Sequence, residues 1–283
     1  MYKRQEEHLI VKFERSYPDN EDYAPFGLIK DNNIDKNQFN KWWKNRQIPA
    51  SRKGFKEVLH KSDIYDKGGF DLLDAKVYCL SLSDQYWVKG IDDNILWEDI
   101  NFFDNVFSED IGKILFDGGN TPLNFNLNTP DMTSNGNYEK RWKIINGDRY
   151  LVKAGGKMIN QEPFNEVIAT KLYERILNDD EYVKYEIVYD NERAVSICKN
   201  FISKDTELIP AWKINEYFVV NEHENRYEHY VRCLNELNTL YRINMRTPTQ
   251  IRKIALRITT NNRLILIHST NQINLVRIIP KHL

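Results

Sequence analysis

Lys153 and Glu166 are the residues of this 283-residue chain whose types and spacing best suit chemistry. Lys153 closes a short run that predicts a strand, and Glu166 lies in the helical pattern that follows it. An ammonium on a strand, held by a carboxylate on the next helix, can be placed against phosphate oxygens. The alternative is an exposed ion pair that contributes little to stability. The segments around the pair favour the functional interpretation.

A run of small residues precedes this pair, formed by Thr133, Ser134, Asn135 and Gly136. Their backbone amides could curl around a phosphate, and the two hydroxyls would add further donors. Alone, such a run is weak evidence, because many Asn-Gly loops have this composition. It gains weight from the elements that follow it.

The next two segments predict a β-hairpin. Lys140–Ile145 and Arg149–Lys153 read as strands, and Asn146-Gly147 between them is a preferred sequence for a two-residue type I′ turn. On the return strand Leu151 and Lys153 share one face, because successive side chains point to opposite sides of a strand. We therefore expect Lys153 at the end of the sheet, beside the small-residue loop.

A helix is expected directly after the hairpin. Gln161-Glu162-Pro163 opens it, since proline is common in the first turn of a helix. Helical spacing and an apolar face are expected to continue through Val167, Ile168, Lys171, Leu172 and Ile176. Glu166, near the start of this helix, can reach Lys153. Kinases hold their phosphate-binding lysine with a helix glutamate in this way.

Residues 118–236 resemble the N-terminal lobe of the HipA-like serine/threonine kinases, in the CtkA-like subgroup. The resemblance is carried by TSNG, RWKI, YLVKAGG, EPFNEVIA and SICKNFISKDTELIPAW. In the N-terminal half, RQIPASRKG and LSLSDQYW are similar to the leader region of the same bacterial proteins. The resemblance implies an α+β fold. Its parts would be a kinase-like N-lobe with a small antiparallel sheet and one helix, an incomplete helical C-lobe, and an α/β N-terminal accessory region.

The resemblance also implies roles for individual residues. Lys153 would bind the phosphates of ATP, with Mg²⁺ as the accompanying ion, and Glu166 would be the helix partner of Lys153. Residues 133–136 would form the phosphate loop. In that loop Ser134 or Thr133 is the candidate for autophosphorylation.

Two further strands, Tyr182–Tyr189 and Arg193–Lys199, are expected to form a second hairpin. The resemblance implies that they lead to a hinge whose backbone groups face adenine, at Lys199, Asn200 and Phe201. Phe201 serves equally well in this interpretation as a structural plug of the hinge or as a contact to the base.

An aromatic helix near the N-terminus has a DNA-binding alternative. Phe39, Trp42 and Trp43 have the spacing of one helical face, Pro49 ends the helix, and a second helix is expected from Ser51. The local sequences WWKNR and SRKG are basic. A recognition helix needs a longer basic run and two supporting helices. Packing of the tryptophans in a core is therefore the preferred interpretation.

Two more elements are expected before residue 118. Lys76–Leu82 reads as a strand, and Asp110–Phe116 as a short helix. Acidic residues are scattered in this half and its histidines are unpaired along the sequence. We therefore expect no catalytic or metal site there.

Three regions follow from these patterns. Residues 6–117 form an N-terminal accessory region, and residues 118–202 the nucleotide-binding lobe, after a boundary rich in turn formers. Residues 203–283 form a partial helical C-lobe with an anomalous tail. Within it, Trp212–Tyr241 has a helical pattern that suits the first large helix of a kinase C-lobe. Met1–Gln5 resemble translated adapter sequence, so we expect the chain to be a fragment.

Composition sets the broad class of the protein. A hydrophobic content of 41% with 29% charged residues is typical of a packed, water-soluble domain. The formal charge of −1 predicts neither nucleic acid nor an anionic membrane as a partner. Cys79, Cys198 and Cys233 lack metal spacing and predict reduced thiols in a cytoplasmic protein. We expect no membrane span and no secretory signal.

Residues 237–283 contain no Asp or Glu, although composition predicts about seven. A kinase C-lobe needs a catalytic Asp, and an Asn and a further Asp that hold metal. The last Asp is Asp205 and the last Glu is Glu236, so neither a catalytic residue nor a metal ligand is identifiable. We hypothesise that the chain has left its reading frame near Leu240–Thr247.

The expected function is that of the resembled family, ATP-dependent phosphoryl transfer to Ser or Thr of an unidentified protein. This particular chain is expected to be inactive, because it lacks the catalytic loop. The alternative is a non-catalytic nucleotide-binding or scaffold protein whose aromatic N-terminal half contacts a partner. A more distant alternative is a DNA-binding regulator that acts through the WWKNR–SRKG region.

The frameshift hypothesis makes a prediction about the nucleotide sequence downstream of codon 240. One of the two other reading frames should encode a catalytic loop of the form Asn-x-Asp-x-x-x-x-Asn. Sequencing this region checks the prediction. If neither frame encodes such a loop, the hypothesis is wrong.

Overall fold

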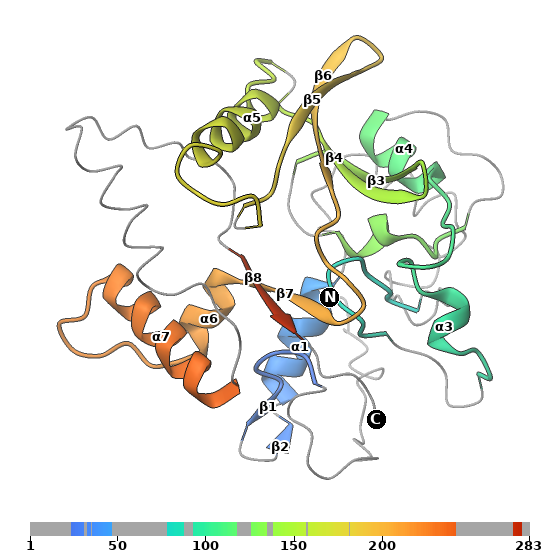
Figure 1. Ribbon diagram of the computed structural model, residues 1–283. Coiled ribbons are helices and arrows are strands. Elements are labelled where there is room, and N and C mark those ends of the chain that lie inside the picture. Colours follow the sequence, from blue (N-terminus) through green and yellow to red (C-terminus); the bar gives the residue numbers. More distant parts are fainter. Residues whose placement is uncertain are drawn as a thin grey trace, which may run out of the picture.

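The computed structural model describes residues 24–30, 33–34, 36–46, 78–87, 93–117, 126–134, 138–156, 158–180, 182–241 and 274–278. These residues form a mixed α and β structure with a small antiparallel sheet and few helices (Figure 1). The expected α+β class is confirmed at this level. The helix expected from Ser51 lies outside the described residues.

The main sheet has four antiparallel strands in the order β3-β4-β6-β5. β3 (Lys140–Ile145) and β4 (Asp148–Lys153) form the first hairpin. β6 (Arg193–Lys199) pairs with β4 on one side and with β5 (Glu186–Asp190) on the other. The strand that ends on Lys153 is therefore an inner strand, with its register fixed from both sides.

The first hairpin has the turn that the sequence predicts. Ile145 pairs with Asp148, which leaves Asn146 and Gly147 as the two turn residues. Their φ angles are 51° and 86°, and a type I′ turn requires positive values at both positions. Asn and Gly are the residues that adopt this conformation at low cost, so local sequence determines this turn.

The second hairpin is shorter than expected. Asn191 and Glu192 connect β5 to β6 with φ angles of 48° and 65°. β5 begins at Glu186, so the expected start at Tyr182 is wrong. Tyr185 instead turns its side chain into the interior, where it is 8% exposed.

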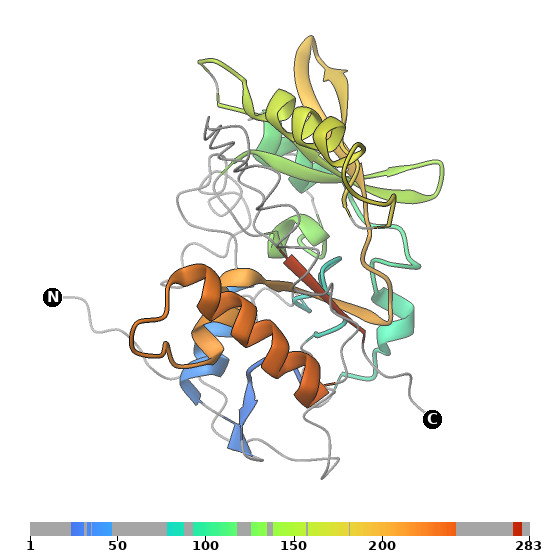
Figure 2. The same ribbon diagram turned by 60° about the vertical axis from the view of Figure 1, so that its left-hand side comes forward.

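α5 (Glu162–Tyr173) follows β4 in the chain and lies across one face of the sheet (Figure 2). Its buried residues include Glu166, Ala169 and Thr170 rather than large apolar side chains. Ala and Thr are small, so the helix can approach β5 and β6 closely.

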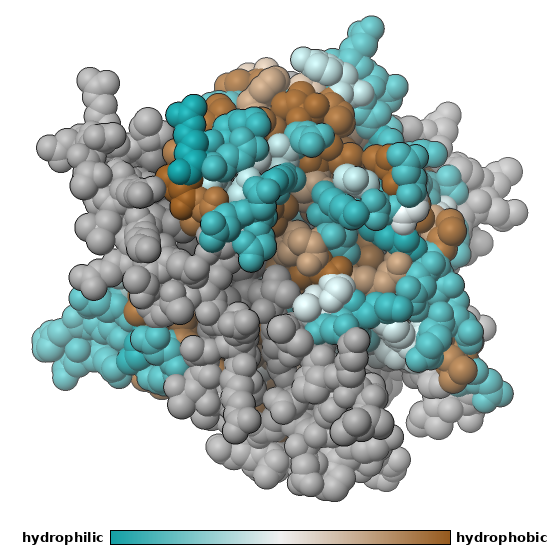
Figure 3. Space-filling view, in the orientation of Figure 1, coloured by the Kyte–Doolittle hydropathy of each residue, from teal (hydrophilic) through white to brown (hydrophobic). Residues whose placement is uncertain are grey.

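The prediction that the apolar residues of α5 form its buried face is therefore wrong. Ile168 and Leu172 are 56% and 37% exposed, and the helix ends before Ile176. Together with Phe164 they form an apolar stripe on the outer side of α5. Figure 3 shows hydrophobic side chains gathered over this part of the surface.

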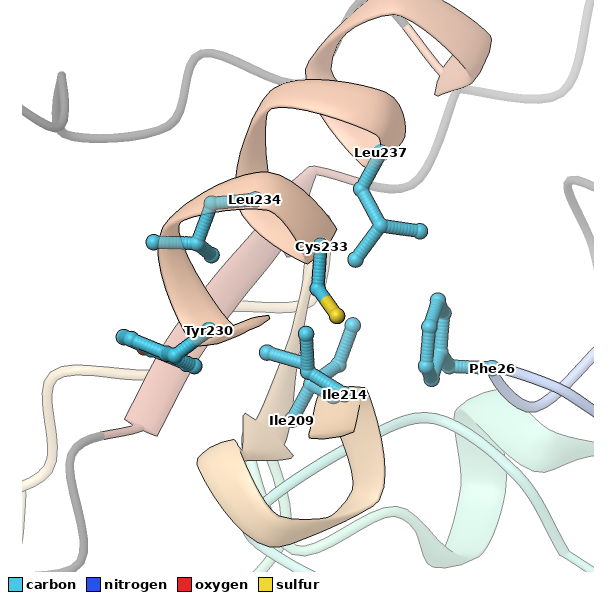
Figure 4. Close-up of a cluster of buried hydrophobic side chains, with 7 residues drawn as sticks. All are labelled: Phe26, Ile209, Ile214, Tyr230, Cys233, Leu234 and Leu237. Carbon is cyan, nitrogen blue, oxygen red and sulfur yellow. The ribbon is translucent and has the colours of Figure 1, made fainter. Parts of the chain in front are cut away.

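A second group of elements surrounds a separate core. It comprises β7 (Thr206–Pro210), α6 (Ala211–Tyr217), α7 (Arg226–Tyr241) and β8 (Asn274–Ile278), with β7 and β8 antiparallel. Figure 4 shows the buried side chains of this core: Phe26, Ile209, Ile214, Tyr230, Cys233, Leu234 and Leu237. Part of the carboxylate-free tail thus pairs, as β8, with β7.

The single helix expected over Trp212–Tyr241 is divided into α6 and α7. Phe218 has an extended backbone and ends α6. Asn225 begins α7, because its side-chain oxygen accepts hydrogen bonds from the backbone N–H groups of Tyr227 and Glu228. The Glu228 carboxylate accepts the N–H of Asn225 in return, which completes a capping box.

The N-terminal half supplies short elements. They are β1 (Ile29–Lys30), β2 (Asn33–Ile34), α1 (Lys36–Asn45), α3 (Trp97–Ile100), α4 (Asp110–Asp117) and the 3₁₀ helix η3 (Pro130–Thr133). α4 confirms the short helix predicted there. Residues 78–82 form no strand, so that expectation is wrong over the described part of 76–82. Cys79 has a φ of 53°, which interrupts an extended backbone.

The hydrophobic cores join the three regions expected from the sequence. Phe116 of α4 packs with Val152, Val195 and other side chains of the main sheet. Phe26 packs into the core of α6 and α7. The N-terminal half is thus part of the packing on which both other regions depend. No helix among the described residues is long and apolar enough to cross a membrane.

The α6–α7 connection predicts a pH dependence of stability. Glu224 accepts hydrogen bonds from Arg232 at 2.9 and 3.0 Å and from the Asn221 N–H at 3.1 Å, and lies 3.1 Å from His229 Nδ1. Arg232 is the main reason that the pKa of Glu224 falls from 4.5 to about 2. Because this pKa is lower in the folded than in the unfolded chain, ionised Glu224 stabilises the fold above pH 4.5. This stabilisation disappears as the pH falls from 4.5 toward 2.

Glu224→Gln should therefore lower the urea midpoint at pH 6, with a difference from the unmodified chain that shrinks between pH 4.5 and pH 2.5. Glu222→Gln is the matched control, because Glu222 is exposed. A difference for Glu224→Gln that stays constant over this pH range would contradict the prediction.

Candidate functional site

Lys153 and Glu166 meet at the end of β4 beneath α5. Lys153 Nζ donates a hydrogen bond of 3.0 Å to Glu166 Oε1. The Glu166 side chain is 5% exposed and that of Lys153 is 26% exposed. The carboxylate is thus buried, while the Lys153 side chain is partly exposed to solvent. The structure brings together the two residues that the sequence singled out.

Tyr185 is a third member of this site that the sequence analysis did not find. Its hydroxyl oxygen accepts a hydrogen bond from Lys153 Nζ at 2.5 Å, and its ring centroid lies 4.5 Å from that nitrogen. The buried thiol of Cys198 interacts electrostatically with the Tyr185 hydroxyl. Burial raises the pKa of both groups, so both stay neutral near pH 7.

Thr170 connects Tyr185 to α5. The Thr170 hydroxyl donates to the backbone oxygen of Glu166 at 3.0 Å and accepts the N–H of Tyr185 at 3.0 Å. The turn of helix that carries Glu166 is therefore tied to the segment that carries Tyr185. This bond holds the two partners of Lys153 at a fixed separation.

The loop between β4 and α5 is closed by side chains. The Gly155 N–H donates to Asn160 Oδ1 at 3.0 Å, and the Gly156 N–H donates to Glu162 Oε2 at 2.9 Å. A Cβ on Gly155 would lie 2.8 Å from Pro163 Cδ, which belongs to a rigid ring at the start of α5, so this position favours glycine. The Gly156 bond is the main reason that the pKa of Glu162 is lowered. These contacts fix the start of α5 relative to Lys153.

The predicted phosphate loop is only partly described. Thr133 ends η3 and is buried, and its hydroxyl donates to the Leu80 oxygen at 2.9 Å. Ser134 is half-buried, and its hydroxyl donates to the Asp131 oxygen at 3.0 Å. Asn135 and Gly136 lie outside the described residues. In this arrangement Ser134 is the more accessible of the two candidate hydroxyls.

The predicted hinge residues lie at and directly after the C-terminal end of β6, whereas Lys153 pairs with Ser196 in the middle of that strand. Lys199 is exposed and its ammonium lies 2.8 Å from Asp148 Oδ2. The Asn200 N–H donates to the Arg149 oxygen at 2.7 Å, and Phe201 is 45% exposed. Since Lys153 is opposite Ser196, the Lys199 side chain is not part of the Lys153 cluster.

Two buried polar atoms beside Lys153 have no hydrogen-bond partner among the described residues. They are Glu166 Oε2 and Ser196 Oγ. Lys153 has three N–H donors, of which Glu166 and Tyr185 accept two. The site therefore combines one remaining ammonium donor with the Ser196 hydroxyl, which can also donate, whereas Glu166 Oε2 can only accept. This arrangement suits an anionic ligand that approaches from the solvent side.

Comparison of the chain with protein-family models, curated proteins and solved structures gave no match.

The buried carboxylate predicts a large cost when Lys153 alone is removed. Lys153→Met leaves Glu166 buried and unpaired, so we expect a loss of about 3 kcal/mol in unfolding free energy. Replacing both residues, Lys153→Met with Glu166→Leu, should recover most of this loss, because no buried charge remains. Urea unfolding measures both values. The prediction is contradicted if the double variant is as unstable as the single one.

Proposed function

We propose that residues 118–202 form a kinase-like nucleotide-binding lobe of the HipA-like type and that the chain binds ATP through Lys153. The observation that carries the proposal is the 3.0 Å pair between Lys153 and the buried Glu166. A solvated surface pair would not require a buried carboxylate. In this pair the buried carboxylate instead fixes the position of the Lys153 ammonium, as the helix glutamate of a kinase does for its phosphate-binding lysine.

The topology around the pair supports the same proposal. The strand that ends on Lys153 is followed in the chain by α5 and then by β5 and β6. β6 inserts between β4 and β5, so the lysine strand is inner and α5 packs against the same sheet. A helix in this place can hold a lysine against the α- and β-phosphates of ATP.

We further propose that this chain transfers little or no phosphate. In the family, the reaction would be transfer to Ser or Thr of a protein, and it requires carboxylates from the C-lobe. The chain has no Asp after Asp205 and no Glu after Glu236. No group of three or more His, Cys, Asp or Glu side chains in the described parts of the chain could hold a metal. We assign no residue of the described parts to Mg²⁺ and no step to it.

The DNA-binding alternative has less support than nucleotide binding. Arg46, which belongs to the WWKNR sequence, is 6% exposed, and its Nη1 donates to both carboxylate oxygens of Asp84 at 2.7 and 2.9 Å. Arg46 also donates to the Cys79 and Tyr86 backbone oxygens. A guanidinium used in this way is not free to contact nucleic-acid phosphates.

Calorimetric titration with ATP tests the proposal. The unmodified chain should bind ATP, and the double variant Lys153→Met with Glu166→Leu should bind it roughly tenfold or more weakly, because a charge-assisted hydrogen bond to phosphate is lost. Adenosine should bind both proteins equally. Lys171→Met is the matched control, since Lys171 lies on α5 but is exposed.

Two results would contradict the proposal. One is the absence of ATP binding to the folded, unmodified chain. The other is equal ATP binding by the double variant. Transfer of labelled phosphate to protein by this chain would separately contradict the proposed lack of activity.

A further inference from the structure

Tyr185 contacts the Lys153 ammonium in two ways. Its oxygen lies 2.5 Å from Lys153 Nζ, and its ring centroid lies 4.5 Å from the same atom. A cation near an aromatic ring is attracted by the ring quadrupole, most strongly where water is excluded. Tyr185 is 8% exposed, so its side of both contacts is buried, while the Lys153 side chain is partly exposed.

The Tyr185 hydroxyl has a fixed orientation. It accepts a hydrogen bond from Lys153 at 2.5 Å. The Tyr185 backbone is held by Thr170, which also bonds to the Glu166 backbone oxygen. The backbone of Tyr185 is thus held by the buried Thr170, and its hydroxyl is held by the half-buried Lys153.

A neutral phenol differs from a second carboxylate in its effect on Lys153. Glu166 supplies one negative charge to the ammonium, and a second carboxylate would give the cluster a net negative charge that repels phosphate. A phenol accepts the second N–H and adds no charge. The third N–H and the solvent-accessible side of Lys153 remain available.

We propose that Tyr185 is a positioning residue for Lys153, which directs the third ammonium N–H toward the polyphosphate of a bound nucleotide. This inference rests on the proposed function, because it assigns a residue to the same phosphate site. Tyr185 acts through Lys153 and touches no phosphate itself.

Tyr185→Phe tests the inference, because it keeps the ring and removes only the hydroxyl. The Kd values for ATP and for inorganic tripolyphosphate should rise roughly five- to tenfold, which is within the range for the loss of one hydrogen bond of ordinary strength. The Kd for adenosine should not change. Tyr189→Phe is the matched control, since Tyr189 lies on β5 and is 73% exposed.

The same substitution in the double variant Lys153→Met with Glu166→Leu separates positioning from a general structural role. If Tyr185 acts through Lys153, Tyr185→Phe should change ATP affinity less than about twofold in that background. A positioning role thus predicts that Tyr185→Phe weakens ATP binding only when Lys153 is present.

Three outcomes would overturn the inference. Equal weakening of ATP and adenosine by Tyr185→Phe would indicate a structural role. Unchanged ATP affinity in Tyr185→Phe, with ATP bound by the unmodified chain, would overturn the role of Tyr185 alone and leave the proposed function intact. Failure of the unmodified chain to bind either ATP or tripolyphosphate would overturn both.

Discussion

The buried carboxylate of Glu166 is the constraint on which the described lobe depends. A carboxylate inside a protein is stable only when a charge and hydrogen bonds compensate for its lost hydration. Lys153 supplies the charge at 3.0 Å. The pair forms only if β4 has its observed register and α5 starts where the closed Gly155–Glu162 loop places it. Pairing with both β3 and β6 fixes the register of β4. The Thr170 hydroxyl donates to the Glu166 backbone oxygen and accepts the Tyr185 N–H, so it ties α5 to the segment that carries Tyr185.

The parts of this arrangement that depend on local sequence could be predicted. Asn146-Gly147 specifies its turn because few other residues accept positive φ at both positions, and Pro163 marks the start of α5. The proximity of Lys153 and Glu166 followed from the order of strand and helix. Each of these predictions needed only residues close in sequence.

Features that depend on tertiary contacts could not be predicted in this way. The inward face of α5 was misassigned because Glu166 and Thr170 are buried through partners on other elements, while Ile168 and Leu172 remain exposed. The sequence pattern places Tyr185 in a strand, and only the fold brings its hydroxyl to Lys153. The break between α6 and α7 was missed because the Asn225–Glu228 capping box lies within a sequence that otherwise has helical periodicity.

We propose that this chain binds nucleotide without turnover. The site has a held lysine with a remaining ammonium donor, while residues 237–283 contain no Asp or Glu. The most direct measurement is a crystal structure of the chain with a non-hydrolysable ATP analogue. We predict that the phosphates lie within hydrogen-bond distance of Lys153 Nζ, with the Glu166 and Tyr185 contacts retained. Nucleotide bound elsewhere, with no phosphate near Lys153, would contradict the central claim.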